Sequence, residues 1–317
     1  MIPDTCELPD APPEKGGWPW RRVNDDPLPA EDVPTQRPWP TISVITPSFN
    51  QGRFLEETIR SVALQGYPAT EHIIIDGGSK DESVEVIQRY ERWVSFWVSE
   101  PDRGQSDAIN KGFARAKGDI LCWLNSDDLL EPGALRRAAR KLRDGRNGAF
   151  ALGDAIMITE DGAPFGALRP FRPSFSTLVN HPRLHAVKGL MFMPAQPAVF
   201  WRREVYDTLA GLDENLVYAM DLDYWLRALE AGFRFQLIRQ PLARYRFHST
   251  SLSGQGWRDF RDEWKAVVHR MRRQTPVARR LRADLMWWTG LLPASLITLP
   301  WRGLAYLRHG RHGRLWT

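Results

Sequence analysis

The stretch Thr41-Ile-Ser-Val-Ile-Thr-Pro47 decides the fold. Its β-branched residues and its closing proline predict a buried strand. Residues 54–65 follow closely, with Leu55, Ile59 and Val62 at helical spacing. A strand followed at once by an amphipathic helix is the beginning of an α/β unit.

The alternation of strand and helix continues along the first half of the chain. Further strands are predicted at 71–75, 93–99 and 119–124, and helices at 79–90, at 104–116 and from Pro132 onward. Ser79 is the expected N-cap of the second helix, and Pro132 is expected in the first turn of its helix. This order predicts a parallel sheet covered by helices on both faces. Beyond residue 145 the pattern becomes mixed, with strands at 149–159, 233–238 and 243–247 and helices at 204–209 and 221–231.

Composition and charge bound the class of protein. The chain has 317 residues, 43% of them hydrophobic, which is enough for one large folded core. Two cysteines far apart in sequence fit a reducing cytoplasm rather than a disulfide framework. The N-terminal forty residues are rich in Pro and acids, so we expect an extended, weakly structured lead segment and no signal peptide.

The C-terminal tail carries most of the excess positive charge. Residues 254–317 contain 13 Lys and Arg against 4 Asp and Glu. Residues 285–301 are uncharged and include Trp287, Trp288 and Trp301, but the run is shorter than a spanning helix needs. The pattern favours a segment that lies in a membrane interface, and a helix packed on the core or on a partner is the alternative. A basic tail on an acidic body is not the pattern of a nucleic-acid reader.

Polar side chains gather where the predicted strands end. They are Ser48, Asn50, Asp76, Asp102, Asp127 and Asp128. In open α/β sheets, ligands bind outside the carboxyl ends of the strands. The sequence therefore predicts an active site at this edge.

Two adjacent acids end the fourth strand, in Asn125-Ser-Asp-Asp128. Adjacent carboxylates repel each other unless a cation lies between them, and hard oxygen ligands suit Mg²⁺ or Mn²⁺ with a phosphate alongside. The alternative is that Asp127 or Asp128 caps the next helix. His248, after a later strand, is a candidate third metal ligand or phosphate partner, or a structural histidine.

Two loops add candidates for binding. Asp76-Gly-Gly-Ser79 offers an acid that can accept from a base N–H, or simply a tight turn. In the polar stretch Glu100 to Lys111, Asp102 is placed to meet a ribose hydroxyl. Three further residues of that stretch reach a ligand or brace the loop: Gln105, Asn110 and Lys111.

A second acidic pair, Asp221 and Asp223, begins a predicted helix. Residues two apart on a helix do not share a face, so one acid can enter a cleft while the other caps the helix or pairs with Arg227. A carboxylate beside an acceptor hydroxyl is a credible general base. Capping by both acids is the alternative.

Four motifs together resemble the family 2 glycosyltransferases with a GT-A fold. They are Ser43-Val-Ile-Thr-Pro-Ser-Phe-Asn50, Phe54-Leu-Glu-Glu-Thr-Ile-Arg-Ser61, Ile74-Ile-Asp-Gly-Gly-Ser-Lys-Asp81 and Leu124-Asn-Ser-Asp-Asp128. The resemblance covers about 41–250 and implies an α/β, Rossmann-like, mostly parallel sheet flanked by helices, with a helical C-terminal extension. The expected domains are a lead at 1–40, a catalytic domain at 41–250 with a nucleotide-binding half (41–128) and an acceptor-binding half (129–250), and a tail at 251–317.

The resemblance also implies roles for individual residues. Those that would bind the nucleotide are Thr46, Pro47 and Asn50 in the pocket, Asp76 on the base, Asp102 near the ribose or diphosphate, and Gln105, Lys111 and Asp127. The metal would rest on Asp127 and Asp128, with His248 near the diphosphate, since Asn125 stands where the family often has its first Asp. Asp221 matches the family's base, and Asp223 is the rival because Met220 replaces the acid that commonly precedes the base.

The function implied is an inverting transfer of a sugar from a nucleotide-sugar donor, with a UDP-sugar favoured, and with Mn²⁺ or Mg²⁺. The acceptor would be a hydroxyl of a saccharide or lipid-linked saccharide, in cell-surface polysaccharide or glycolipid assembly on the cytoplasmic face of the membrane. Residues 160–200, including Gln196 and the 181–185 stretch, are expected to select the acceptor. The alternatives are a sugar-phosphate nucleotidyltransferase and a non-catalytic membrane-associated scaffold.

Overall fold

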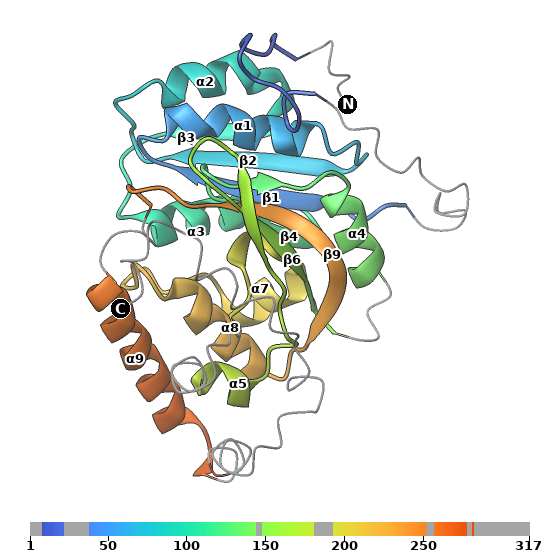
Figure 1. Ribbon diagram of the computed structural model, residues 1–317. Helices are drawn as coiled ribbons and strands as arrows, with labels where there is room; N and C mark the ends of the chain where they lie inside the picture. Colours follow the sequence, from blue (N-terminus) through green and yellow to red (C-terminus); the bar gives the residue numbers. More distant parts are fainter. Residues whose placement is uncertain are drawn as a thin grey trace.

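The protein is an α/β structure built on one continuous nine-stranded sheet. The computed structural model describes residues 8–21, 38–143, 148–180, 193–251, 257–277 and 281. Figure 1 shows the N-terminal strands and their helices at one end of the molecule and helices α5, α8 and α9 at the other. The strand order is β3-β2-β1-β4-β8-β6-β9-β5, with β7 paired to β6.

The first four strands form the parallel part of the sheet. β1 (Ile42–Ser48) pairs with β2 (Thr70–Asp76) and with β4 (Ile120–Trp123), and β2 pairs with β3 (Phe96–Ser99). All seven residues of β1 are buried, as its central position requires. The predicted strands at 41–47, 71–75, 93–99 and 119–124 are thus confirmed.

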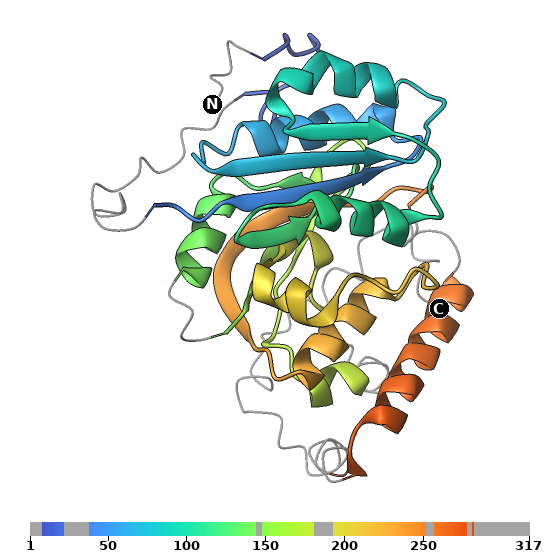
Figure 2. The ribbon, with the colours of Figure 1, turned by 180° about the vertical axis from the view of Figure 1, so that it is seen from behind.

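Helices cover both faces of this parallel part, as predicted (Figure 2). On one face lie α1 (Gly52–Ala63), α2 (Ser83–Tyr90) and the short η3 (Glu91–Trp93). On the other lies α3 (Gln105–Arg115), whose Ile109 and Phe113 belong to the main core. The α3 helix packs so closely that a Cβ at Gly112 would lie 2.4 Å from Cγ2 of Ile45.

The second half of the sheet is mixed. β6 (Phe150–Ile158) runs parallel to β9 (Phe235–Arg246), whereas β8 (Val199–Arg202) is antiparallel to both β4 and β6. β5 (Leu129–Leu130) and β7 (Pro164–Leu168) add antiparallel pairs to β9 and β6. The remaining elements are α4 (Ala134–Leu142), α5 (Phe175–Val179), η4 (Gln196–Ala198), α7 (Arg203–Leu209) and α8 (Met220–Glu230).

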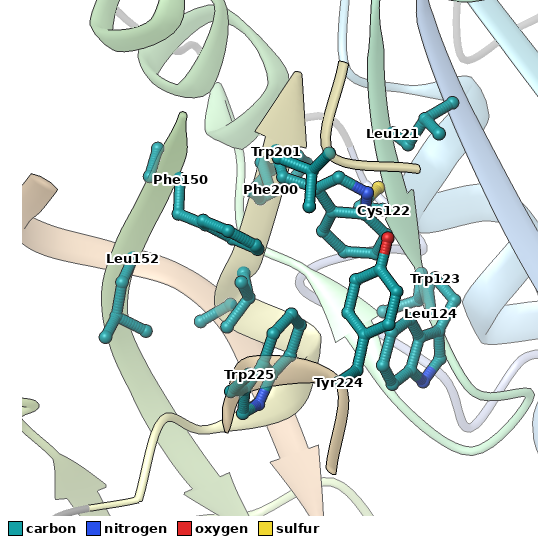
Figure 3. Packing of buried hydrophobic residues seen from close by; sticks show 14 of the residues in the cluster. Leu121, Cys122, Trp123, Leu124, Phe150, Leu152, Phe200, Trp201, Tyr224 and Trp225 are labelled. Atoms are coloured by element: carbon teal, nitrogen blue, oxygen red, sulfur yellow. The ribbon is translucent and has the colours of Figure 1, made fainter. Parts of the chain in front are cut away.

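Aromatic side chains fill the core between the sheet and α8 (Figure 3). Trp123 of β4 and Trp225 of α8 stack with ring centroids 5.6 Å apart, and Trp201 of β8 meets both edge-on. Phe150 of β6 stacks on Phe235 of β9 at 4.4 Å. Because such large rings tolerate little displacement, this cluster fixes α8 firmly on the sheet.

Residues 8–21 form an N-terminal strap that packs against α1 and α2. Leu8, Trp18 and Trp20 are buried, and the Trp18 indole N–H donates to the Leu130 carbonyl at 2.8 Å. The expectation of weak structure across the lead is therefore wrong for these residues. Two buried tryptophans supply enough apolar area to hold a segment with no helix or strand of its own.

Several element boundaries differ from those predicted. The second helix begins at Ser83 rather than Ser79, because Ser79 turns its hydroxyl back to Asp76. Pro132 precedes α4, and the left-handed Gly133 (φ +70°) begins that helix. The two strands predicted at 233–238 and 243–247 are one strand, β9.

The described part of the C-terminal tail is helical, as expected. α9 (Trp257–Gln274) packs on α8 through Trp264, Val267 and Met271. Residues 285–301 lie outside the described residues. Within the described part of the chain, no helix combines the length and apolarity needed to cross a membrane.

Candidate active site

The sheet register brings distant strand ends to one edge. β1, β2, β3 and β4 are parallel, so their carboxyl ends share that edge. β8 runs opposite to β4, which places Gln196, just before β8, at the same edge, where its side-chain N–H donates to the Trp123 carbonyl at 2.8 Å. β9 follows β6 in parallel and ends there with Arg246 and His248.

The short strand β5 ties the predicted metal acids to the end of β9. Leu129 pairs with Arg244, so Asp127 and Asp128 lie beside the residues that follow β9. Nε2 of His248 lies 2.9 Å from Oδ2 of Asp127, whose side chain is 17% exposed. The structure therefore brings together the acid and the histidine that the sequence singled out.

Asp128 is more deeply buried than Asp127. It is fully buried, and its Oδ1 accepts a hydrogen bond from the Arg246 backbone N–H at 2.9 Å. Burial, together with the adjacent Asp127 charge, raises the pKa of Asp128 well above its ordinary value. Asp128 was predicted as a metal ligand, but in this conformation it braces the turn from within and only Asp127 is presented at the edge.

The buried side chain of Arg246 holds this turn through hydrogen bonds and an ion pair. Its guanidinium is buried, donates to the Asp127 carbonyl at 2.8 Å and pairs with Glu57 of α1 at 2.5 Å. Burial would raise the pKa of Glu57, but Lys15 of the strap and Arg246 outweigh burial and lower it. A buried carboxylate paired in this way stays ionised and holds the turn in place.

Asp76 serves a turn rather than an open pocket. Its carboxylate is buried and accepts from the backbone N–H groups of Gly78 and Ser79 and from the hydroxyls of Ser79 and Ser99, at 2.5–3.1 Å. Asn50, in the left-handed region (φ +52°), joins this turn by donating its N–H to the Ser79 hydroxyl. Contact between Asp76 and a base, which the resemblance implies, would require the turn to open and stays a prediction.

Asp102 and Phe49 flank the glycine turn after β2. A Cβ at Gly77 would lie 2.5 Å from Oδ2 of Asp102 and 3.2 Å from Cδ2 of Phe49, so all three meet at one point. Phe49 is 59% exposed, although a large aromatic side chain usually seeks burial. The sequence analysis missed Phe49; the signal available was an aromatic residue directly after a strand that ends in polar residues.

The other predicted nucleotide-binding residues make contacts within the protein. Thr46 is fully buried, and its hydroxyl lies 3.0 Å from Nε2 of His72. Pro47 is buried in β1. Lys111 pairs with Glu100 at 3.0 Å and so braces its loop. Their direct contact with a nucleotide stays a prediction.

Amide side chains join α3 to the turn at 125–128, which contains the proposed metal ligand Asp127. Gln105 donates to Oδ1 of Asn125 at 2.8 Å, and Asn125 lies 3.4 Å from the Gln196 side chain and 3.5 Å from Asp128. Asn125 occupies the position where an acid was expected, and here it works as a hub of hydrogen bonds. Residues 181–185, named with Gln196 as acceptor candidates, lie outside the described residues. Asn110 holds the loop before α8 through Leu212.

The two acids of α8 have different surroundings. Asp223 is 1% exposed and is held by Arg227 at 2.7 Å and by Arg270 at 2.6 Å. Asp221 is partly buried and accepts a hydrogen bond from the Leu222 backbone N–H. Burial raises the pKa of Asp221 to about 6. A carboxylate poised near neutral pH suits proton abstraction, whereas one fixed by two arginines does not.

The side chains of Asp127 and His248, beside the turn at 125–128, fit a divalent cation that is shared with a bound ligand. Among the residues that the structure describes, no three His, Cys, Asp or Glu side chains form a ready metal site. Mg²⁺ commonly takes only one or two protein carboxylates, with water and substrate phosphates completing its shell. Asp127 supplies a carboxylate oxygen of the kind that Mn²⁺ and Mg²⁺ prefer, and Nε2 of His248 lies 2.9 Å from it.

This fold and this arrangement of strand-end acids define the GT-A class of glycosyltransferases. S. aureus TarS 1–349, solved in complex with UDP-GlcNAc, has a similar fold with a TM-score of 0.58 at 16% identity, covering 75% of this chain and 68% of the 1–349 chain. The mannosyltransferase PcManGT from Pyrobaculum calidifontis, solved with GDP-Man and Mn²⁺, gives 0.53 at 18% identity, covering 89% and 87%. Residues 43–209, more than half of the chain, match the family described as Glycosyl transferase family 2. The chain belongs to this family and is a glycosyltransferase.

Two bacterial relatives are similar over most of the folded core. A protein of Bacillus subtilis, TuaG, named as a teichuronic acid biosynthesis glycosyltransferase, is 28% identical over 71% of this chain and 86% of its own length. The amylovoran biosynthesis glycosyltransferase AmsB of Erwinia amylovora is 27% identical over 65% of this chain and 69% of its own. Over a shorter stretch, 28% of this chain and 34% of the relative, an uncharacterized Mycobacterium tuberculosis glycosyltransferase is 49% identical.

Proposed function

We propose that the protein transfers a sugar, with inversion, from a nucleotide-sugar donor to an acceptor hydroxyl, with Asp221 as general base. The observation that carries the proposal is a contrast within α8: Asp223 pairs with two arginines, whereas Asp221 pairs with no arginine among the described residues. In a single displacement, Asp221 takes the proton of the acceptor hydroxyl as its oxygen attacks the anomeric carbon. The bond from that carbon to the donor diphosphate breaks at the same time.

The donor would lie along the edge formed by the ends of β1, β2 and β4. The exposed ring of Phe49 offers a face for stacking on the base, and the adjacent carboxylate of Asp102 is placed to accept from a ribose hydroxyl. Asp127 and His248 would hold Mn²⁺ or Mg²⁺. When bound, the cation neutralises charge on the departing nucleoside diphosphate.

A UDP-sugar is the favoured donor, and polysaccharide assembly is the favoured setting. The structural neighbours hold UDP-GlcNAc and GDP-Man, which supports a nucleotide sugar as the class of donor. The names of TuaG and AmsB support a role in polysaccharide biosynthesis. The uncharged run 285–301, which lies between Asp284 and Arg302 in a tail with an excess of basic residues, supports peripheral contact with the inner face of the cell membrane.

A thermal-shift panel tests the donor. UDP-Glc, UDP-Gal, UDP-GlcNAc, UDP-GlcA and GDP-Man are each added to the full-length protein with Mn²⁺ or with EDTA. At least one UDP-sugar should raise the Tm with Mn²⁺ and not with EDTA. An equal rise in Tm in Mn²⁺ and in EDTA would contradict metal-dependent donor binding. A rise in Tm with GDP-Man alone would contradict the proposal that the donor is a UDP-sugar.

A product assay tests the reaction. With the donor selected by the panel and a set of saccharide acceptors, the proposal expects nucleoside diphosphate release and a product of inverted anomeric configuration by NMR. A nucleotidyltransferase would instead release pyrophosphate from a nucleoside triphosphate and a sugar phosphate. Metal-dependent donor binding without turnover on any acceptor would point to the scaffold alternative.

A further inference from the structure

The turn that leads into α8 takes its hydrogen bonds from a different helix. Ala219, the residue before α8, makes no side-chain cap hydrogen bond. The carboxylate of Glu263 on α9 instead accepts from the backbone N–H groups of Val217 at 2.8 Å, Tyr218 at 3.1 and 3.2 Å, and Ala219 at 3.3 Å. Since backbone N–H groups need acceptors, one carboxylate from α9 defines the path of this turn.

A second residue of α9 contacts α8 just after the proposed base, Asp221, in the sequence. Arg270 donates to Asp223 at 2.6 Å and to Asp213 at 2.8 Å. Glu263 and Arg270 are seven residues apart, so they lie two turns apart on the same face of α9. Together they hold the segment that contains Asp221 at a point before it and a point after it.

We propose that Glu263 is a positioning residue for the transfer reaction, which acts by fixing the turn that presents Asp221 to the acceptor. The proposal rests on the assignment of Asp221 as base under the proposed function. Glu263 and the rest of α9 lie beyond 43–209, the part of the chain that matches the family. Under this proposal α9 contributes to the reaction by positioning Asp221.

Glu263 also acts on Asp221 through charge. Burial is the main cause of the raised pKa of Asp221, backbone hydrogen bonds act against it, and the negative charge of Glu263 adds a smaller upward contribution. On α9 itself, Asp262 pairs with Arg261 and with Lys265. Several charged groups on α8 and on the other helices and the loop packed against it also have neighbours of their own. These are Asp223 with Arg227 and Arg270, Asp213 with Arg270, Glu214 with Arg103, Glu204 with Arg202, Arg203 with the Gly118 carbonyl, Asp207 near Tyr224, and Glu230 with Thr275. Replacing Glu263 by glutamine should therefore lower the pKa of Asp221.

The first experiment needs no ligand. The Tm of the full-length protein is measured from pH 4 to pH 8 for wild type, Asp221→Asn, Glu263→Gln and the double variant. Because the folded pKa of Asp221 is above its unfolded value, ionisation of Asp221 destabilises the folded state as the pH rises. The Tm gain of Asp221→Asn should therefore grow in wild type from about pH 4, near the unfolded pKa of an aspartate, up to about pH 6 and stay constant above it. In the Glu263→Gln background the gain should be smaller and should level off at lower pH.

The second experiment measures turnover. Release of nucleoside diphosphate is followed with Mn²⁺, each nucleotide sugar of the panel above and the set of saccharide acceptors used in the product assay. Glu263→Ala should lower kcat about 10- to 100-fold with donor KM unchanged, because a displaced base affects the chemical step and not donor binding. Asp262→Asn, an exposed acid one position away on α9, is the matched control and should match wild type.

The outcomes separate the inference from the function on which it rests. If Asp221→Asn abolishes turnover but Glu263→Ala keeps the kcat of wild type, the inference about Glu263 fails alone. If Asp221→Asn turns over normally, the assignment of the base fails and the inference fails with it. If Glu263→Ala changes the Tm but neither kcat nor the coupling, Glu263 has a structural role only.

Discussion

The imidazole Nε2 of His248 lies 2.9 Å from Oδ2 of Asp127, although 121 residues separate the two in the chain. The pairing of β5 with β9 creates this contact, because it sets the turn after β4 beside the end of β9. Nδ1 of the same imidazole lies 2.9 Å from the Thr250 hydroxyl, which fixes the orientation of the ring. The proposed metal site is thus a product of sheet topology rather than of a local sequence motif.

Asp127→Asn is expected to weaken the Mn²⁺-dependent part of donor binding. Loss of the carboxylate removes the charged oxygen of the proposed site, and the apparent affinity for Mn²⁺ should fall at least about 10- to 100-fold. Isothermal titration of Mn²⁺ in the presence of UDP measures this. Glu204→Gln, an exposed acid on α7 away from the site, should bind as wild type does. Unchanged Mn²⁺ affinity in Asp127→Asn would remove Asp127 from the site.

Asp221→Asn and Asp223→Asn should fail in different ways. The first should lower kcat roughly 10²–10⁴-fold with donor affinity preserved, because it removes a base and no structural contact. The second breaks a buried cluster with Arg227 and Arg270 and should cost about 3–5 kcal/mol of stability. Turnover and chemical denaturation, measured on both variants, distinguish them. A stable but inactive Asp223→Asn protein would reverse the assignment.

The rate of transfer should depend on pH through Asp221. Its raised pKa of about 6 means that the carboxylate is ionised, and able to accept a proton, above that pH. At saturating donor, kcat should therefore rise with pH and level off above about pH 7, with roughly a tenth of the maximum remaining at pH 5. A pH–rate profile checks this. A flat profile between pH 5 and pH 8 would be inconsistent with Asp221 as base.

Phe49→Ala should weaken nucleotide binding without unfolding the protein. The ring is 59% exposed, so little packing is lost, whereas a stacked base is worth about 1–3 kcal/mol. The Kd for UDP should rise roughly tenfold or more, and Phe49→Tyr should restore it. Titration calorimetry measures the affinity and a melting curve verifies the fold. Equal UDP affinity in Phe49→Ala and wild type would show that the ring does not contact the base.

The parallel half of the fold was predictable because its signals are local. β1 is a buried β-branched run, and α1 has its apolar residues on one face. β5 and β8 were not predicted, because strands of two and four residues owe their existence to partners far along the chain. β9 was split into two predictions because Pro241 interrupts its pattern; the sheet tolerates this proline where the register with β6 shifts.

The residues of the candidate site could be named from the sequence, but their orientations could not. Asp127, His248, Asp102 and Asp221 could be named from residue type and position at the ends of elements. Sequence could not show that Asp127 faces outward while Asp128 faces inward, since that depends on the backbone of β9 docking against Asp128. Nor could it separate Asp221 from Asp223, because Arg270 comes from a helix 47 residues further along the chain.

The guanidinium of Arg60 on α1 links the N-terminal strap to the rest of the protein. It is 1% exposed, donates to the carbonyls of Pro9, Pro19 and Trp20 and to the Tyr90 hydroxyl, and lies 4.8 Å from the Trp20 ring centroid. A shortened version that starts at residue 38 would strand a positive charge against an apolar surface with most of its acceptors gone.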